Sequence, residues 1–260
     1  MEQLPEFNRV KHCRHGRMLY NINDIYIGRS LDLYGEFSEG EVELFRQMVR
    51  PGDVILDVGA NIGVHTVFFA AATGPKGAVL AFEPQRLIFQ TLCANIALNN
   101  FLNVWCMNVA LGDAPGSIRV PTLNPAMRNN FGGLSLGSYS QGDHVEVIRL
   151  DSLQLGSCRL IKIDVEGMEL QVLRGATGLI ERFRPALYVE NDRTEHSAEL
   201  IRYIDSLDYD MYWHRPPLFN PANFFKHLEN VFGNIVSGNM LCIPKSAGGT
   251  IAGLPTVEVP

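Results

Sequence analysis

Hydrophobic and polar positions along this chain switch between short buried strands and helical repeats. A mostly apolar stretch begins at Val54 and ends in Asp57, the pattern of a buried parallel strand. A Gly-Ala-Asn-Ile-Gly turn follows at residues 59–63, and residues 64–72 are apolar at helical spacing. A second buried strand is predicted at 78–82 and closes on Glu83. This order predicts the first strand, turn and helix of a nucleotide-binding α/β unit.

The rest of the chain repeats this alternation, with one interruption. The pattern predicts helices at 86–99, 169–179 and 195–207, and strands at 104–110, 160–163, 185–190, 209–212 and 239–243. No helical pattern occurs between residues 114 and 144. We expect a β-hairpin insertion there, pairing Ser117–Val120 with Val145–Leu150, and a flexible loop at 129–136 near the substrate. The whole order predicts an α/β fold with a mostly parallel sheet.

Both ends of the chain differ from this central pattern. Residues 1–50 are predicted to be an N-terminal extension that caps the sheet, with a short hairpin in 17–27 that turns at 21–24 and a helix that begins near Ser38. Tyr34 and Glu36 are candidate ligand contacts in this cap. The main domain is expected at 51–245. Residues 246–260 are rich in Gly, Ala and Pro, and predict a flexible tail.

Composition narrows the class of protein. The chain of 260 residues is 46% hydrophobic and 19% charged, as in globular proteins with a large core. Its net charge of −6 gives no electrostatic footprint for nucleic acid. We find no apolar run of the ~18 residues that a membrane span needs, and no secretory signal in residues 1–5. The five scattered cysteines predict reduced thiols and a cytoplasmic location. The sequence is compatible with a homo-oligomer but does not predict the oligomeric state.

The ligand of the glycine turn is narrowed by Glu83. An acid about 20 residues after such a turn, at the end of a strand, is placed to bind two ribose hydroxyls. NAD and S-adenosylmethionine both present such a ribose. The turn lacks the third glycine of dinucleotide sites, and Asp57 precedes it, so S-adenosylmethionine is favoured. The predicted cofactor residues are Asp57, Gly59, Ala60, Asn61, Gly63, Thr66 (with His65 as a further candidate), Glu83, Asn108 and Ala110.

Five ordered segments of the chain resemble the FkbM family of methyltransferases. They are residues 57–63, 82–84, 108–112, 161–169 and 172–176, and the predicted strand at 185–190 continues the match. The resemblance implies a Rossmann-like class I methyltransferase fold, with a seven-stranded, mostly parallel sheet and an antiparallel last strand. It also implies S-adenosylmethionine-dependent O-methylation of a small-molecule hydroxyl. Sugars and polyketide-type metabolites of natural product biosynthesis are the common acceptors.

Methyl transfer to an aliphatic hydroxyl needs a base, because the hydroxyl is a poor nucleophile until its proton is removed. Asp164 is the first candidate, since it ends a strand predicted to lie next to the first one. Lys162, two residues earlier, is expected on the same side and paired with an acid. Glu166 and His214 are the further candidates. Asp164, Glu190 and Asn191 also resemble the magnesium site of catechol-type O-methyltransferases, so Mg²⁺ is a candidate cofactor.

Two other functions remain open at this point. A nicotinamide-dependent oxidoreductase would share the fold, although the chain lacks the G-x-G-x-x-G turn. A non-catalytic binding protein with a relic cofactor fold is the second. The missing G-x-G-x-x-G turn argues against the oxidoreductase, and the intact turn together with Glu83 and Asp164 argues against the binding protein.

Overall fold

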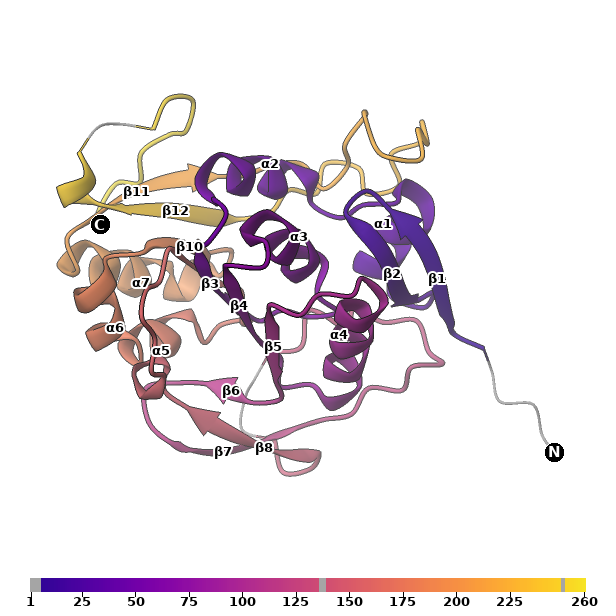
Figure 1. The fold of residues 1–260 in the computed structure, drawn as a ribbon, viewed down its shortest axis with the longest axis horizontal. Coiled ribbons are helices and arrows are strands. Elements are labelled where there is room, and N and C mark those ends of the chain that lie inside the picture. The colour runs from indigo at the N-terminus through magenta and orange to yellow at the C-terminus, as the bar shows by residue number, and fades with distance from the viewer. Residues whose placement is uncertain (1–5, 136–138, 249–250) are drawn as a thin grey trace.

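A seven-stranded sheet runs through the computed structural model, which describes residues 6–135, 139–248 and 251–260 (Figure 1). The strand order is β11-β12-β10-β9-β3-β4-β5, and only β12 runs antiparallel to its neighbours β10 and β11. The predicted mostly parallel sheet with an antiparallel last strand is therefore confirmed. The bounds are β3 (Val54–Val58), β4 (Ala78–Phe82), β5 (Val104–Met107), β9 (Leu160–Ile163), β10 (Ala186–Glu190), β11 (Tyr209–His214) and β12 (Asn239–Pro244).

Helices cover both faces of this sheet. Successive strand residues point to opposite faces, so Ile55 packs with helices α2 and α3, whereas Leu56 packs with α5, α6 and α7. Helix α4 lies on the α3 side and packs with Ala81. Burial on both faces explains why these strands are almost wholly apolar. The bounds are α2 (Glu39–Met48), α3 (Val64–Thr73), α4 (Arg86–Leu98), α5 (Glu169–Arg174), α6 (Thr177–Phe183) and α7 (Thr194–Ser206).

The predicted hairpin insertion is present, as β7 (Gly116–Val120) paired antiparallel with β8 (Asp143–Ile148). The predicted strand at 104–110 is wrong at its end, because β5 stops at Met107 and a separate strand, β6 (Ala110–Leu111), pairs with β8. Asn108 makes the bend: its side-chain amide donates to the carbonyls of Glu83 and Pro84. The last residue of the predicted loop at 129–136 lies outside the described residues.

The N-terminal cap differs from the prediction. The hairpin is formed by β1 (Asn8–Cys13) and β2 (Gly16–Asn21), and residues 21–24 lead instead into helix α1 (Ile27–Tyr34). The reason is local: side-chain oxygens of Asn21 and Asp24 accept the N–H groups of Asn23 and Tyr26, which turns the chain toward the helix. Residues 1–5, from which we predicted no secretory signal, lie outside the described residues.

Two other predicted segments differ in detail. The single helix expected at 169–179 is divided into α5 and α6, and Gly175 between them packs against the carbonyl oxygen of Gly112, where a side chain would not fit. Residues 255–257, within the predicted flexible tail, lie along β11 through hydrogen bonds from Trp213 N–H to Pro255 and from Val257 N–H to Met211. The division of the chain at 51 and 245 stays a prediction.

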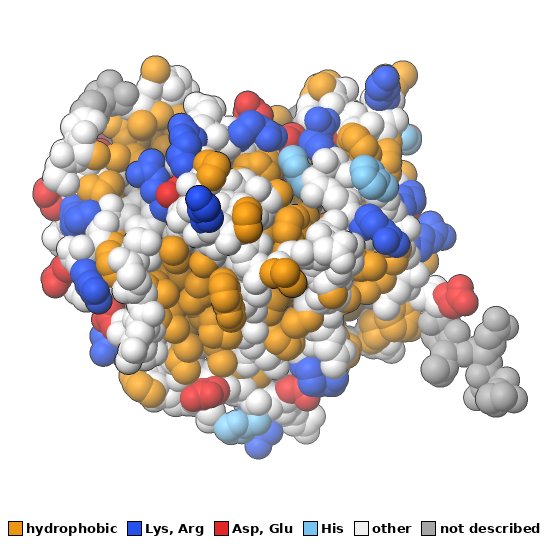
Figure 2. Space-filling view, viewed as in Figure 1, with side chains coloured by type: hydrophobic (Ala, Val, Ile, Leu, Met, Phe, Trp, Pro, Cys, Tyr) orange, Lys and Arg blue, Asp and Glu red, His pale blue; other side chains and the backbone are white. Residues whose placement is uncertain are grey.

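One face of the molecule carries exposed hydrophobic side chains in its lower half (Figure 2). Strand β5 is an edge strand of the central sheet, and Trp105 on it is 55% exposed. Within the described ranges, no helix is long and apolar enough to cross a bilayer. Oligomerisation is not decided by these features and stays open.

Candidate functional site

Strand β3 has β4, the next strand of the sheet along the chain, on one side and β9 on the other, so the strand order reverses between β3 and β9. A cavity of about 220 Å³ opens at the carboxyl ends of these strands. A ligand crevice is expected at such a point in an open α/β sheet. We call it the strand-end cavity. It is lined by the glycine turn, by the residues that follow β4, β9 and β10, by parts of α1 to α3, by the segment 130–133 and by the start of β12.

The glycine turn forms one wall of the strand-end cavity. Gly59 has φ +75°, and a Cβ atom there would lie 1.7 Å from the carbonyl oxygen of Asp164. Only glycine lets these two chain segments approach so closely. Asn61 also has a positive φ, +51°, a conformation that Asn adopts more readily than most residues. The predicted residues Gly59, Ala60 and Asn61 line the cavity.

Glu83 lies at the cavity and is only 3% exposed. Its two carboxylate oxygens accept the N–H groups of Asn61, at 3.0 Å, and Gln85, at 2.8 Å. Burial raises the pKa of Glu83 to about 7. This carboxylate therefore joins the glycine turn to the start of α4, and its role in binding a ribose stays a prediction.

Lys162, Asp57 and Thr66 form a buried layer behind the glycine turn. The Lys162 ammonium lies 3.4 Å from both Asp57 and Asp164 and donates to the Gly59 carbonyl, at 3.2 Å. The Thr66 hydroxyl donates to Asp57, at 2.6 Å. The predicted pairing of Lys162 with an acid is confirmed. Asp57 and Thr66 are wholly buried and support the turn from behind.

Three of the acids that line the strand-end cavity form a cluster. One oxygen each of Asp164, Glu166 and Glu190 lies within 4.8 Å of the others. Burial, with the charges of Asp164 and Glu166, raises the pKa of Glu190 to about 11. Glu166 is paired with Arg193, at 2.6 Å. Such a donor set fits a hard cation, but a proton on Glu190 relieves the same repulsion.

The predicted metal ligand Asn191 is not among the residues that line the strand-end cavity, and its role as a ligand stays a prediction. Its side-chain amide lies 3.3 Å from the Met240 sulfur, and its N–H donates to Gly238. Glu166 lies in the acidic cluster, because φ of +56° at Glu166 turns the chain just beyond β9. That conformation is rare for glutamate, and the sequence pattern carried no signal for it.

Several other predicted residues lie away from the strand-end cavity. Asn108 is engaged in the bend after β5, and Ala110 packs in the core of the small sheet. His214 is the last residue of β11 and not part of a loop, and its Nδ1 lies 2.8 Å from the Tyr188 hydroxyl. Gly63 precedes α3 with φ +86° and packs on Leu92. The proposed roles of these residues stay untested predictions.

Two buried polar residues of the cavity wall are Glu41, which was not among the predicted site residues, and His65, which was a candidate. Glu41, expected only as a first-turn acid of α2, is 5% exposed and accepts hydrogen bonds from Ser38 and Asn239. His65 Nε2 lies 3.6 Å from Glu41. Burial, with the charges of Lys162 and His15, holds the pKa of His65 well below its usual value. Contacts between α2, α3 and β12 could not be read from any one segment.

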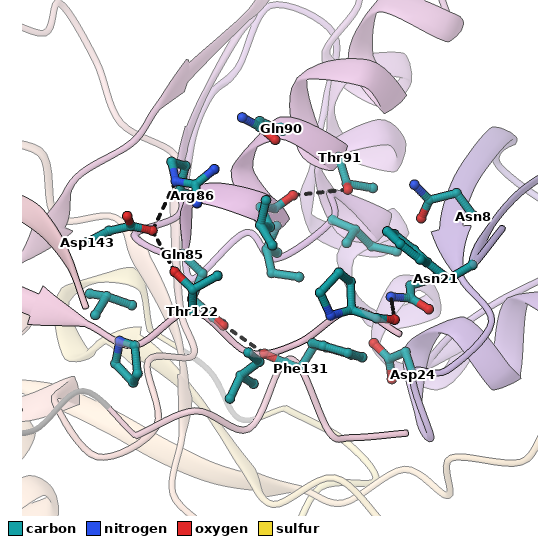
Figure 3. Close-up of a pocket in the computed structure, with 18 of the residues that line it drawn as sticks. Asn8, Asn21, Asp24, Gln85, Arg86, Gln90, Thr91, Thr122, Phe131 and Asp143 are labelled. Atoms are coloured by element: carbon teal, nitrogen blue, oxygen red, sulfur yellow. Dashed lines mark hydrogen bonds and ion pairs between the residues drawn. The ribbon is translucent and has the colours of Figure 1, made fainter. Parts of the chain in front are cut away.

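A second cavity, of about 270 Å³, lies beside the first (Figure 3). It is enclosed by the hairpin β1–β2, the N-terminal half of α4 and the hairpin β7–β8 with the loop that follows β7. We call it the hairpin cavity. It could not be predicted from the sequence, because its walls come from segments that are distant along the chain.

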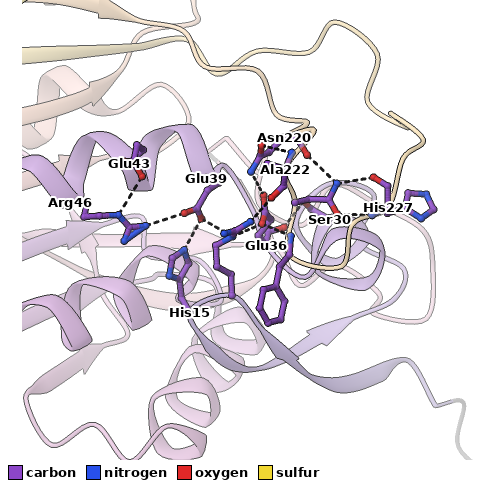
Figure 4. A network of polar contacts seen from close by, with 12 residues as sticks. His15, Ser30, Glu36, Glu39, Glu43, Arg46, Asn220, Ala222 and His227 are labelled. Carbon is purple, nitrogen blue, oxygen red and sulfur yellow. Dashed lines mark hydrogen bonds and ion pairs between the residues drawn. The ribbon is translucent and has the colours of Figure 1, made fainter.

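Tyr34 and Glu36, the cap residues predicted near the ligand, instead join the cap to the loop after β11. Figure 4 shows Glu36 next to Asn220 of that loop. The Glu36 carboxylate is buried and accepts hydrogen bonds from Arg14, Asn220 and the N–H of Phe224. The Tyr34 hydroxyl donates to the carbonyl of Glu229. These contacts hold the cap against the loop after β11, and neither Tyr34 nor Glu36 lines the strand-end cavity.

Replacing Glu36 with Gln should lower the free energy of unfolding by about 2 kcal/mol, because buried hydrogen bonds to a charged group are lost. Urea denaturation measures this change. Glu43→Gln is the control, since its pair with Arg46 is largely exposed and contributes under about 0.5 kcal/mol. Equal midpoints for the two variants would contradict the role of Glu36.

Comparison with known proteins identifies relatives of this chain. A family model described as the methyltransferase FkbM domain matches residues 57–211, more than half of the chain. Methyltransferase 1 of Beauveria bassiana is 31% identical over 46% of this chain and 57% of its own length. The hexuronic acid methyltransferase AglP of Haloferax volcanii is 29% identical over 60% of this chain and 62% of its own length.

A third relative aligns over more of its length. The 31-O-demethyl-FK506 methyltransferase FkbM of Streptomyces tacrolimicus is 28% identical over 84% of this chain and 91% of that protein. Among solved structures, the methyltransferase FkbM of Methylobacillus flagellatus has a TM-score of 0.51 and 21% identity, over 76% of this chain and 50% of that one. At this identity the likeness supports the fold alone.

Proposed function

The chain belongs to the FkbM methyltransferase family, and we propose that it transfers a methyl group from S-adenosylmethionine to a hydroxyl of a small glycosyl or polyketide-type molecule. Two relatives carry names that fit these acceptor classes, one a hexuronic acid and the other a demethylated polyketide. The observation that carries the cofactor proposal is Glu83, buried at a strand end and bonded to the turn at Asn61.

S-adenosylmethionine would supply an electrophilic methyl group on a positively charged sulfur. The acidic side chains around the cavity favour such a cation. The glycine turn and Glu83 would hold the nucleoside, and orientation of the acceptor hydroxyl against the methyl group would provide much of the catalysis.

Asp164 is the proposed base that takes the hydroxyl proton as the oxygen–carbon bond forms and the carbon–sulfur bond breaks. Among the three clustered acids it is the best acceptor of that proton. Glu190 retains its own proton at neutral pH, and Glu166 is held by Arg193. Lys162 would position the Asp164 carboxylate, from 3.4 Å.

Calorimetric titration of the purified protein with S-adenosylhomocysteine, and separately with NAD, tests the proposal. We expect micromolar binding of S-adenosylhomocysteine and none of NAD. Acceptor assays with 31-O-demethyl-FK506 and a hexuronic acid glycoside, each with and without Mg²⁺, follow from that result. Tight binding of NAD alone would favour the oxidoreductase and refute the methyltransferase.

The variant Glu83→Gln should bind S-adenosylhomocysteine about 30- to 100-fold more weakly, because an ionised acceptor for two ribose hydroxyls is lost. With a pKa of about 7, Glu83 is protonated below neutral pH in the free protein. Binding to the wild type should therefore tighten as pH rises from 6 to 8, whereas the variant stays nearly constant. Calorimetry at three pH values measures both effects.

Glu181→Gln on the exposed surface of α6 is the matched control and should retain the wild-type affinity and its pH dependence. An affinity for Glu83→Gln equal to that of the wild type would exclude Glu83 from the cofactor site.

A further inference from the structure

The hairpin cavity is separated from the strand-end cavity by a thin wall. Neighbouring residues line opposite sides of it: Asn61 faces the strand-end cavity and Ile62 the hairpin cavity, while Gly132 faces the first and Phe131 the second. The two cavities are therefore adjacent, and one molecule of moderate size can contact both.

The wall is held in place by backbone contacts. The side-chain amide of Gln85 donates to the Phe131 carbonyl, at 2.8 Å, and the N–H of Ile25 donates to the Asn129 carbonyl, at 3.0 Å. A Cβ atom on Gly132 would lie 2.6 Å from the Asn61 side-chain amide, so the segment packs closely against the glycine turn. Because Gln85 also donates its N–H to Glu83, the wall is joined to the proposed cofactor site.

The inner surface of the hairpin cavity is mainly apolar. Hydrophobic side chains reach it from all sides, among them Leu19, Ile62, Leu87, Leu123 and Phe131. Its volume lies near the lower end of the range of about 300–1,000 Å³ that small-molecule sites occupy. Figure 3 shows the labelled polar side chains around this space, from the N-terminal hairpin on one side and from α4 and β8 on the other.

The ionisable side chains of the hairpin cavity are one arginine and two aspartates, so their net charge is negative and disfavours an anionic ligand. Arg86 pairs with Asp143, at 3.0 Å, and Asp143 also accepts the Thr122 hydroxyl. Asp24 is 4% exposed and accepts the N–H of Tyr26. Among the described lining residues, these are the only ionisable side chains.

The strand-end cavity is also unfavourable for an anion. Its described lining includes six carboxyl groups and one ammonium group, and that ammonium, on Lys162, is already shared by Asp57 and Asp164. An acceptor that carried a carboxylate would bring like charges together in both cavities, which costs free energy. The carboxyl groups are Glu41, Glu83, Asp164, Glu166, Glu190 and Asp192.

We propose that the hairpin cavity binds the body of the methyl acceptor, an uncharged and largely apolar molecule, while the acceptor hydroxyl lies in the strand-end cavity. The assignment of this molecule as the acceptor rests on the proposed function. It narrows the acceptor to a neutral polyketide-type or neutral glycosidic compound and excludes an acidic sugar.

Fluorescence titration with two dyes tests the cavity: neutral Nile red and anionic 8-anilinonaphthalene-1-sulfonate, each with and without saturating S-adenosylhomocysteine. Thr91→Arg places a cation and extra volume into the cavity from α4, and Leu123→Arg does so from the opposite wall. Ala97→Arg is the control, on the exposed side of the same helix. Calorimetry with S-adenosylhomocysteine reports on the fold and cofactor site of every variant.

We expect saturable Nile red binding that S-adenosylhomocysteine changes less than twofold, and sulfonate binding at least tenfold weaker. Thr91→Arg and Leu123→Arg should weaken Nile red at least tenfold, and Ala97→Arg less than twofold. Displacement of Nile red by S-adenosylhomocysteine would assign the cavity to the cofactor and overturn the proposal, as would wild-type Nile red binding in both cavity variants. If the wild type does not bind S-adenosylhomocysteine, the proposed function is wrong. The dye titration would still test whether the hairpin cavity binds a neutral apolar molecule.

Discussion

Lys162→Met is expected to lower the free energy of unfolding by about 3–5 kcal/mol, because it leaves a buried carboxylate without its counter-ion. Asp57 is wholly buried, and the Lys162 ammonium, 3.4 Å away, is its charged partner among the described residues. The Thr66 hydroxyl remains as a hydrogen-bond donor but carries no charge. Methionine retains the approximate shape of the lysine stem, so the loss measured is mainly electrostatic.

The loss of stability in Lys162→Met should depend on pH. In the wild type, burial alone would lower the pKa of Lys162, but Asp164 and Asp57 outweigh it and raise the pKa, so the ammonium stays charged from pH 5 to 8. In the variant, a buried carboxylate is left without a counter-ion, and the cost of burying it falls when it binds a proton. Protonation then favours the folded state of the variant. The difference in free energy of unfolding between wild type and variant should therefore be smaller at pH 5 than at pH 8.

Urea denaturation at pH 5 and pH 8 measures both effects. The double variant Asp57→Asn with Lys162→Met removes both charges and should recover part of the lost stability. Lys245→Met is the control, since its pairs with Asp205 and Asp208 lie at the surface. A Lys162→Met curve that coincides with the wild-type curve at both pH values would show that the buried layer contributes nothing to stability.

Most of the central sheet could be predicted from the sequence because its signals are local. Strand β4, Ala78–Phe82, matches its predicted bounds, and α4 ends one residue before its predicted end. Asn108 shows where this approach fails. The apolar pattern continues from Val104 to Ala110, but the Asn108 amide binds two carbonyls of the preceding loop and directs the chain into another sheet. Such a contact joins segments that the pattern treats separately.

The candidate site was predictable where one segment supplies both the residue and its position. Glu83 and Asp164 follow strands, and their cavity positions follow from the sheet order. Glu41 and the wall at 130–133 reach the cavity only through packing of the cap and the insertion, which periodicity does not describe. Asn191 had the right place along the chain, but its amide turns toward Met240. Strand-end position alone does not fix where a side chain points.

Gly59→Ala is expected to cost about 2–6 kcal/mol in the free energy of unfolding, or to prevent folding, for two reasons that can be separated. Alanine is strained at φ +75°, which costs about 1–3 kcal/mol. Its Cβ would also lie 1.7 Å from the Asp164 carbonyl oxygen, so the end of β9 must move away from the turn. Such overpacking costs about 1–3 kcal/mol or more. Movement of Asp164 would also disturb its contact with Lys162.

Alanine variants of two further glycines separate the cost of backbone strain from the cost of the steric clash with Asp164. Gly52 has φ +92° but open space around it, so Gly52→Ala should show only the strain, about 1–2 kcal/mol. Gly156 has neither feature, and Gly156→Ala should stay within about 0.5 kcal/mol of the wild type. Urea denaturation of the three variants should therefore rank Gly59→Ala far above Gly52→Ala, and Gly52→Ala above Gly156→Ala. If Gly59→Ala and Gly52→Ala lose equal stability, the approach of the turn to β9 does not constrain residue 59, and strain alone accounts for its glycine.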